Sequence, residues 1–161
     1  MTESSRRREQ KVWRGGVWSS GKFVGDWLAG RFKGGSFDGT WHGGVWQNGT
    51  WLNGTWLDGE WRNGVWKDGV WHTGHWHNGE WRDGAWSGGE WHGGKWLCGD
   101  FYEGDWYGGE WHDGTWFGGT WFGGEWLGGY WMSGLIMDYD KGHVVDSKVD
   151  PVAYFGGKNN G

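Results

Sequence analysis

An aromatic side chain recurs every fifth residue along most of this chain. The spacing is unbroken from Trp41 to Trp131, and all 21 tryptophans fall in this register. It also holds upstream from Trp13, except that the intervals before Trp27 and Trp41 are four residues long. Glycine stands two residues before every one of these twenty-five rings except Trp13, where Lys11 replaces it. The repeating unit is therefore glycine, any residue, an aromatic ring and two mostly polar residues.

A period of five suits neither a helix nor a flat strand. Positions five apart rotate around a helix, and each interior glycine destabilises a helix by about 1 kcal/mol. In a strand, side chains alternate between faces, so rings five apart would point to opposite sides. A bend in every unit returns all rings to one side, which predicts an all-β coil with short straight faces.

Glycine is expected at each corner of that coil, where it permits backbone conformations and close approaches that a Cβ would block. The core must consist mainly of indole rings, because 20% of the residues are aromatic and aliphatic residues are few. Several of the glycines follow Asn or Asp, in dipeptides typical of tight turns: Asn48-Gly49, Asn53-Gly54, Asp58-Gly59, Asn63-Gly64, Asp68-Gly69, Asn78-Gly79 and Asp83-Gly84.

The unit resembles that of the pentapeptide-repeat proteins over residues 11–136. In that family a large apolar residue occupies the centre of the unit and a small one lies two residues earlier; here these are tryptophan and glycine. The resemblance implies a quadrilateral, right-handed β-solenoid with four units per coil. A second resemblance is to MORN repeats: segments 102–109 and 117–124 are similar to their Tyr-x-Gly-x-Trp-x-x-Gly core. It implies an open β-hairpin array instead, although the longer MORN period is missing here.

The limits of the repeat divide the chain into three segments. Residues 1–10 form a basic N-terminal arm, residues 11–136 the repeat domain, and residues 137–161 a C-terminal cap or partner-binding tail. The net charge is −5, and the mildly acidic repeat region disfavours nucleic-acid binding. Cys98 is alone, and no apolar run is long enough for a signal peptide or a membrane span. We therefore expect a protein without a membrane anchor, in a virion if phage-encoded and otherwise in the cytoplasm.

No catalytic constellation interrupts the repeat, so the sequence predicts neither an enzyme nor a cofactor. The one notable cluster is His72, His75 and His77, where the last two flank Trp76 on the same outward side. A surface metal site is sterically conceivable, but a zinc site needs a third close ligand. The pattern favours histidines that simply fill outward polar positions, with no metal.

The position directly after each ring predicts a binding surface. Through the middle of the chain it is chiefly polar, as at Arg62, Lys67 and His72. From Leu97 onward seven of eight of these residues are apolar or aromatic: Leu97, Tyr102, Tyr107, Phe117, Phe122, Leu127 and Met132, with His112 as the exception. On an outward-facing position this pattern predicts a belt of protein contacts around the C-terminal third, unless the tail folds back over it.

These features favour a structural or adaptor protein that binds protein partners, with homo-oligomerisation among the possible assemblies. Glycine- and tryptophan-rich short repeats resemble those of phage structural proteins, which implies a capsid-decorating, neck or tail component. Two alternatives stay open. The pentapeptide-repeat resemblance allows a soluble inhibitor of an enzyme such as a topoisomerase, and exposed tryptophans would suit a glycan-binding module.

Overall fold

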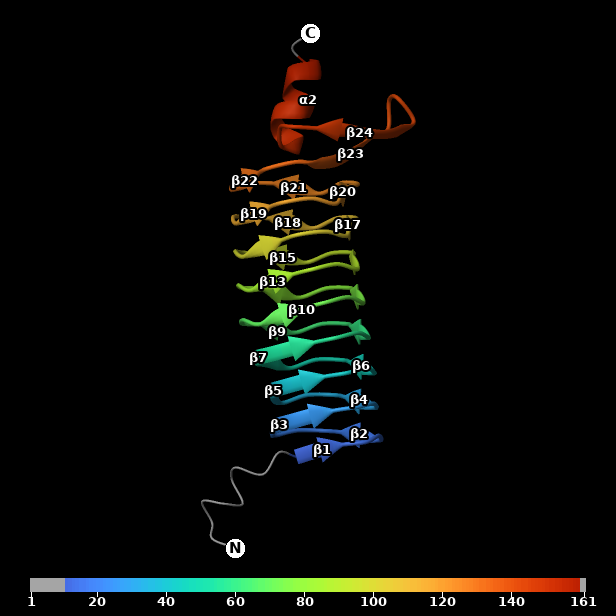
Figure 1. The fold of residues 1–161 in the computed structure, drawn as a ribbon, viewed down its shortest axis with the longest axis vertical. Helices are drawn as coiled ribbons and strands as arrows, with labels where there is room; N and C mark the ends of the chain where they lie inside the picture. Colours follow the sequence, from blue (N-terminus) through green and yellow to red (C-terminus); the bar gives the residue numbers. More distant parts are fainter. Residues whose placement is uncertain (1–10, 160–161) are drawn as a thin grey trace, which may run out of the picture.

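A computed structural model describes residues 11–159 of the chain as a rod of stacked β-coils (Figure 1). Strand pairing joins residues that are 15 positions apart: Trp51 pairs with Trp66, and Trp66 with Trp81. Each coil therefore contains three pentads, and about eight coils make up the rod. The all-β solenoid is confirmed, whereas the expectation of four units per coil is wrong. Three indoles already fill the cross-section.

The three pentads of each coil form three faces of short parallel strands. The first face contains β1 (Lys11–Trp13), β10 (Val70–Trp71), β13 (Ala85–Trp86), β16 (Asp100–Phe101), β19 (Thr115–Trp116) and β22 (Tyr130–Trp131). The second face contains β2 (Val17–Trp18), β4 (Arg31–Phe32), β6 (Val45–Trp46), β8 (Glu60–Trp61), β11 (His75–Trp76), β14 (Glu90–Trp91), β17 (Asp105–Trp106), β20 (Thr120–Trp121) and β23 (Gly134–Asp138). The third face contains β9 (Val65–Trp66), β12 (Glu80–Trp81), β15 (Lys95–Trp96), β18 (Glu110–Trp111) and β21 (Glu125–Trp126).

Three longer strands join the third face to the first near the N-terminal end. They are β3 (Lys22–Trp27), β5 (Ser36–Trp41) and β7 (Thr50–Trp56). In β3 and β5 the two rings are four residues apart, and the chain runs on as strand where other units have a corner. Coils that contain such an interval have 14 residues, as the pairing of Lys22 with Ser36 shows. The ladder continues past the two short intervals, with a shift of register between Phe37 and Asp38 where β5 pairs with β7.

The interior consists of three continuous columns of aromatic rings, one behind each face. Trp51 and Trp66 lie face to face, with centroids 4.6 Å apart and planes 4° apart. Within one coil, neighbouring rings such as Trp66 and Trp71 meet edge to face at 5.9 Å and 70°. Both geometries are favourable for aromatic pairs. Every inward ring of these columns from Phe23 to Trp116 is fully buried, so the core is the indole core that the composition predicts.

Glycine forms the corners for two reasons that Gly69 illustrates. Its φ is +128°, a conformation that L-residues rarely adopt. A Cβ added there would collide with the carbonyl oxygen of Gly54 on the preceding coil and lie 3.2 Å from the indole nitrogen of Trp51. The preceding Asn or Asp keeps an ordinary φ, and its side chain accepts a bond from the glycine N–H, as Asp83 does from Gly84 at 2.8 Å.

Two backbone hydrogen bonds per pentad connect successive coils. The residue after each ring donates to the ring residue one coil earlier, as in His72 N to Trp56 O at 2.8 Å. The residue before each ring donates to a corner glycine, as in His75 N to Gly59 O at 3.0 Å. Because these ladders are parallel, the described repeat region is not the hairpin array that the MORN resemblance implies. Some indoles also donate to a corner carbonyl, as Trp56 does to Thr73 at 3.1 Å.

A different structure closes the C-terminal end of the rod (Figure 1). Strand β23 pairs antiparallel with β24 (His143–Ser147), and helix α2 (Pro151–Asn159) follows. Tyr154 and Phe155 of α2 pack against the aromatic core. The Tyr154 hydroxyl donates to the buried carboxylate of Asp138 at 2.7 Å, which ties α2 to β23. The predicted basic arm, residues 1–10, lies outside the described residues.

Candidate functional site

Residues on either side of each inward ring point away from the core, and those on one face line up in columns. Stacking of coils places residues 15 positions apart directly above one another. The position after the ring therefore forms one outer column per face. The seven residues predicted to bind partners are divided among all three columns. They therefore lie around the rod and do not form one continuous patch.

The first face carries the most continuous part of this surface. Tyr102 and Phe117 stack with centroids 4.8 Å apart and planes 7° apart. Met132 follows in the same column, and the three side chains are 46%, 39% and 58% exposed. Tyr130, in the column before the ring, is 71% exposed. Exposed aromatic and thioether groups of this kind are typical anchors of protein interfaces.

The second and third faces carry the remaining four residues. On the second face Tyr107 is exposed and stacks on the half-buried Phe122, with centroids 4.7 Å apart. On the third face Leu97 is half-buried and Leu127 exposed, and the polar His112 separates them. The aliphatic column is thus interrupted, whereas the aromatic columns on the other two faces are continuous.

The C-terminal tail covers part of these columns but leaves a cleft. The cleft has a volume of about 470 Å³ and lies between the last coil and the cap. Phe122 and Leu127 line it on the coil side, and Pro151, Val152 and Phe155 on the cap side. The tail therefore approaches the ends of the second and third columns here, and Tyr102 and Phe117 line a separate hollow together with Leu135 and Asp146.

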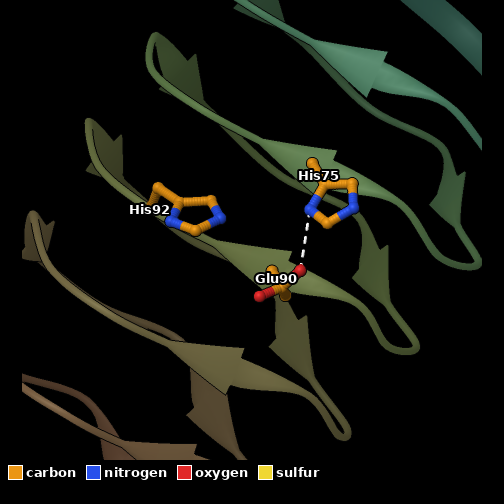
Figure 2. Close-up of side chains that lie close together, drawn as sticks. All are labelled: His75, Glu90 and His92. Carbon is orange, nitrogen blue, oxygen red and sulfur yellow. Dashed lines mark ion pairs between the residues drawn. The ribbon is translucent and has the colours of Figure 1, made fainter.

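A second cluster lies on the second face, in the middle of the rod (Figure 2). His75 and Glu90 precede the rings of β11 and β14 and are paired residues in the ladder. The His75 Nδ1 atom lies 2.7 Å from Glu90 Oε2. His92 follows the ring of β14, and ligand atoms of the three side chains all lie within 4.8 Å of one another. We call His75, Glu90 and His92 the histidine cluster.

Neighbouring groups influence the electrostatics of this cluster. Burial lowers the pKa of His92, the nearby His77 and His75 lower it further, and the carboxylate of Glu90 opposes the shift. Burial also raises the pKa of Asp105, which lies one coil beyond Glu90 in the same column, and Glu90 itself adds to that shift. The rings of His77 and His92 are nearly parallel, with centroids 5.4 Å apart.

His75 and His77 could be singled out from the sequence, whereas Glu90 and His92, which complete the group around His75, could not. His72, which the sequence pattern groups with them, belongs to the first face, where it follows the ring of β10. Glu90 and His92 come from the next coil, and only a spacing of 15 residues brings them close. With four pentads per coil, His75 would instead face Lys95. The missing information was therefore the number of units in a coil.

Neither the scan against protein-family models nor the searches of curated proteins and of solved structures finds a match to this chain. The pentapeptide and MORN resemblances thus rest on the residues alone. Within residues 11–159 no helix is long and apolar enough to cross a membrane.

Proposed function

We propose that this chain is a rigid, non-catalytic structural or adaptor protein that binds protein partners through the outer columns of its C-terminal coils. The observation that carries this proposal is the exposed column of Tyr102, Phe117 and Met132 on the first face. These side chains extend a column that is occupied by His72 and Ser87 in the middle coils. The fold tolerates polar residues there, so the core does not require the aromatic ones.

Among the described tryptophans only Trp13 and Trp18, at the N-terminal end of the rod, are partly exposed, which is too few for a glycan-binding row of tryptophans. From Trp27 to Trp131 no tryptophan is more than 9% exposed, and stacking on a sugar requires an accessible ring. The buried tryptophans serve the fold, and the exposed tyrosine and phenylalanine side chains are the ones available to a partner.

The setting that we propose is a bacteriophage virion, with the chain as a capsid-decorating, neck or tail component. Two features support it: the resemblance of the repeat to those of phage structural proteins, and a rod whose C-terminal end is closed by a cap. Mass spectrometry of purified particles tests the setting. Detection at a stoichiometric level supports it, and absence from particles that are otherwise complete contradicts it.

The binding surface is tested by the double substitution Tyr102→Lys with Phe117→Lys. Both side chains lie outside the core, so we expect an unchanged circular dichroism spectrum and a thermal midpoint within a few degrees of the wild type. Incorporation into particles, or self-association in analytical ultracentrifugation, should be lost. Phe122 is left intact because it lines the cleft beside the cap.

The matched control is His72→Lys with Ser87→Lys, in the same column of the same face. It introduces the same charge on middle coils, and we expect it to leave assembly intact. If the first variant folds and assembles like the wild type, the first face is not an interface. If both variants fail equally, the loss reflects added positive charge and the aromatic column has no special role.

A further inference from the structure

The histidine cluster lies on the second face, away from the first-face column of Tyr102, Phe117 and Met132, and has the composition of a metal site. Its His92 ring stacks on Tyr107, the next residue of the second-face column, with centroids 5.0 Å apart. Two imidazoles and one carboxylate are a recognised ligand set for zinc, at distances of about 2.0–2.2 Å. Calcium and magnesium prefer sites made of oxygen atoms, so the two imidazoles select against them. Among the described residues, His75, Glu90 and His92 are the only group of three or more metal-ligating side chains whose ligand atoms converge.

The backbone beneath the cluster is held firmly. Each of the three residues is adjacent to Trp76 or Trp91, which are fully buried and stacked with centroids 4.7 Å apart. The ladder also fixes the register of β11 against β14. Metal ligands in a tetrahedral site lie about 3.3 Å apart, given typical zinc bond lengths. The ligand atoms already lie within 4.8 Å of one another, so they need to approach by at most about 1.5 Å to reach this spacing.

The side chains have the freedom that this approach needs. The His75 side chain is 49% exposed and that of Glu90 33% exposed, so neither is locked in the core. The existing contact between His75 Nδ1 and Glu90 Oε2 already brings two ligand atoms together. Figure 2 shows the His92 ring on the same side of the face as this pair, just past the end of β14.

We propose that His75, Glu90 and His92 bind a divalent transition-metal ion of the zinc class, with solvent completing its coordination. Two of the ligands belong to one coil and the third to the preceding coil, so the ion connects successive coils. Because the unfolded chain does not hold these three groups together, binding stabilises the folded rod.

Another histidine of the rod provides a matched control. The His112 Nε2 atom lies 3.3 Å from Glu110 Oε1, so this pair also combines an imidazole with a carboxylate. Its column neighbours one coil away are Leu97 and Leu127, and no second imidazole completes the set. Removal of the His112 ring therefore deletes an equivalent histidine without touching the cluster.

The test is calorimetric titration of the untagged, full-length chain with ZnCl₂. A Cys98→Ser background is used because Cys98 is free and exposed, and a cysteine thiolate is itself a type of zinc ligand. We expect one binding site per chain, weakened at least tenfold by either His75→Ala or His92→Ala and unchanged by His112→Ala. Circular dichroism checks that each variant is folded. Titration with Co²⁺ provides a second readout, because visible absorption bands report the geometry of the bound ion.

The thermal midpoint of the cluster-intact protein should rise with added ZnCl₂, and this rise should disappear in His92→Ala. Two results would overturn the proposal. One is that the folded protein does not bind zinc. The other is that His75→Ala and His92→Ala bind zinc as tightly as the control variant His112→Ala. In either case His75 and Glu90 form an ordinary surface ion pair.

Discussion

The coils between Trp41 and Trp96 and those between Phe101 and Trp131 have similar interiors but different exteriors. Ring stacking continues through both regions, with centroid distances of 4.6 Å between Trp51 and Trp66 and 5.0 Å between Trp111 and Trp126. The outer columns change from mostly polar to mostly aromatic and aliphatic. The inner ring and the corner glycine therefore determine the shape of the rod, while the outer positions are free to carry a function.

The corners of the two regions also differ. Asn-Gly and Asp-Gly pairs are common in the middle coils, whereas Gly-Gly predominates near the C-terminal end, as at Gly123-Gly124. The second residue of each pair is a glycine with a positive φ in both regions. The first has an ordinary φ, so its identity can vary without a change in the path of the chain.

The largest effect should come from removing an inner ring, and it should be the same in both regions. We expect Trp66→Ala and Trp111→Ala each to lower the free energy of unfolding by about 3–5 kcal/mol, because both rings are fully buried in the same column. Denaturant titration followed by circular dichroism measures the loss. Lys67→Ala, at the outward position after Trp66, should change it by less than about 0.5 kcal/mol.

A much smaller loss of unfolding free energy for Trp111→Ala than for Trp66→Ala would contradict the similarity of the two interiors. It would mean that the C-terminal interior is loosely packed, and that its outer residues contribute to stability and not to binding alone.

An intermediate effect is expected at the corners, with opposite signs at adjacent positions. Gly124→Asn should destabilise the rod by about 1–3 kcal/mol, because φ is +104° there and the new Cβ would meet the carbonyl oxygen of Gly109. Gly123→Asn should stabilise it by about 0.5–1 kcal/mol, since the unfolded chain loses freedom. The new side chain would also accept a bond from Gly124, as Asn78 does from Gly79 at 2.9 Å.

Thermal unfolding of the two variants in parallel measures these effects. Equal destabilisation by both substitutions would show that the Gly-Gly corners follow a different path from the Asn-Gly corners.

The smallest effect is expected at Phe101, the boundary between the two regions. Its centroid lies 5.7 Å from that of Trp86 but 4.2 Å from that of Trp116, so the smaller ring is offset from Trp86. Phe101→Trp should extend the ring overlap with Trp86 and stabilise the rod by about 0.5 kcal/mol. Differential scanning calorimetry measures the shift. A lower thermal midpoint would indicate that the coil at the boundary is too narrow for a third indole.

Most of the solenoid could be predicted from the period and the residue types. A ring at an odd spacing and a glycine at a fixed distance before it together require a corner in every unit, and that much is confirmed. The number of units per coil could not be obtained in this way, because three or four pentads return every ring to the inside equally well. Ring size decides it: Trp66, Trp71 and Trp76, meeting edge to face, already close the interior.

Predicting the candidate sites in full would also have required the number of pentads per coil. The outward direction of Tyr102 and Phe117 follows from the inward direction of their neighbouring rings, so it could be predicted one unit at a time. Contacts between coils could not be predicted in this way, because they depend on which residues lie 15 positions apart. The proximity of His92 to His75 is of this second kind. The cap was predicted as a segment, but the bond from Tyr154 to Asp138 leaves no periodic signal in the sequence.

The coil of three equal pentads has a consequence for how such a chain can change through its gene. Duplication of 15 codons would add one coil, about 4.8 Å of length, and leave every downstream side chain on its original face. Duplication of five codons would keep the rings stacked but turn everything beyond the insertion by one face. The column of Tyr102 and Phe117 would then point in a new direction relative to the histidine cluster. The length of the rod and the angle between its binding surfaces can therefore change independently of each other.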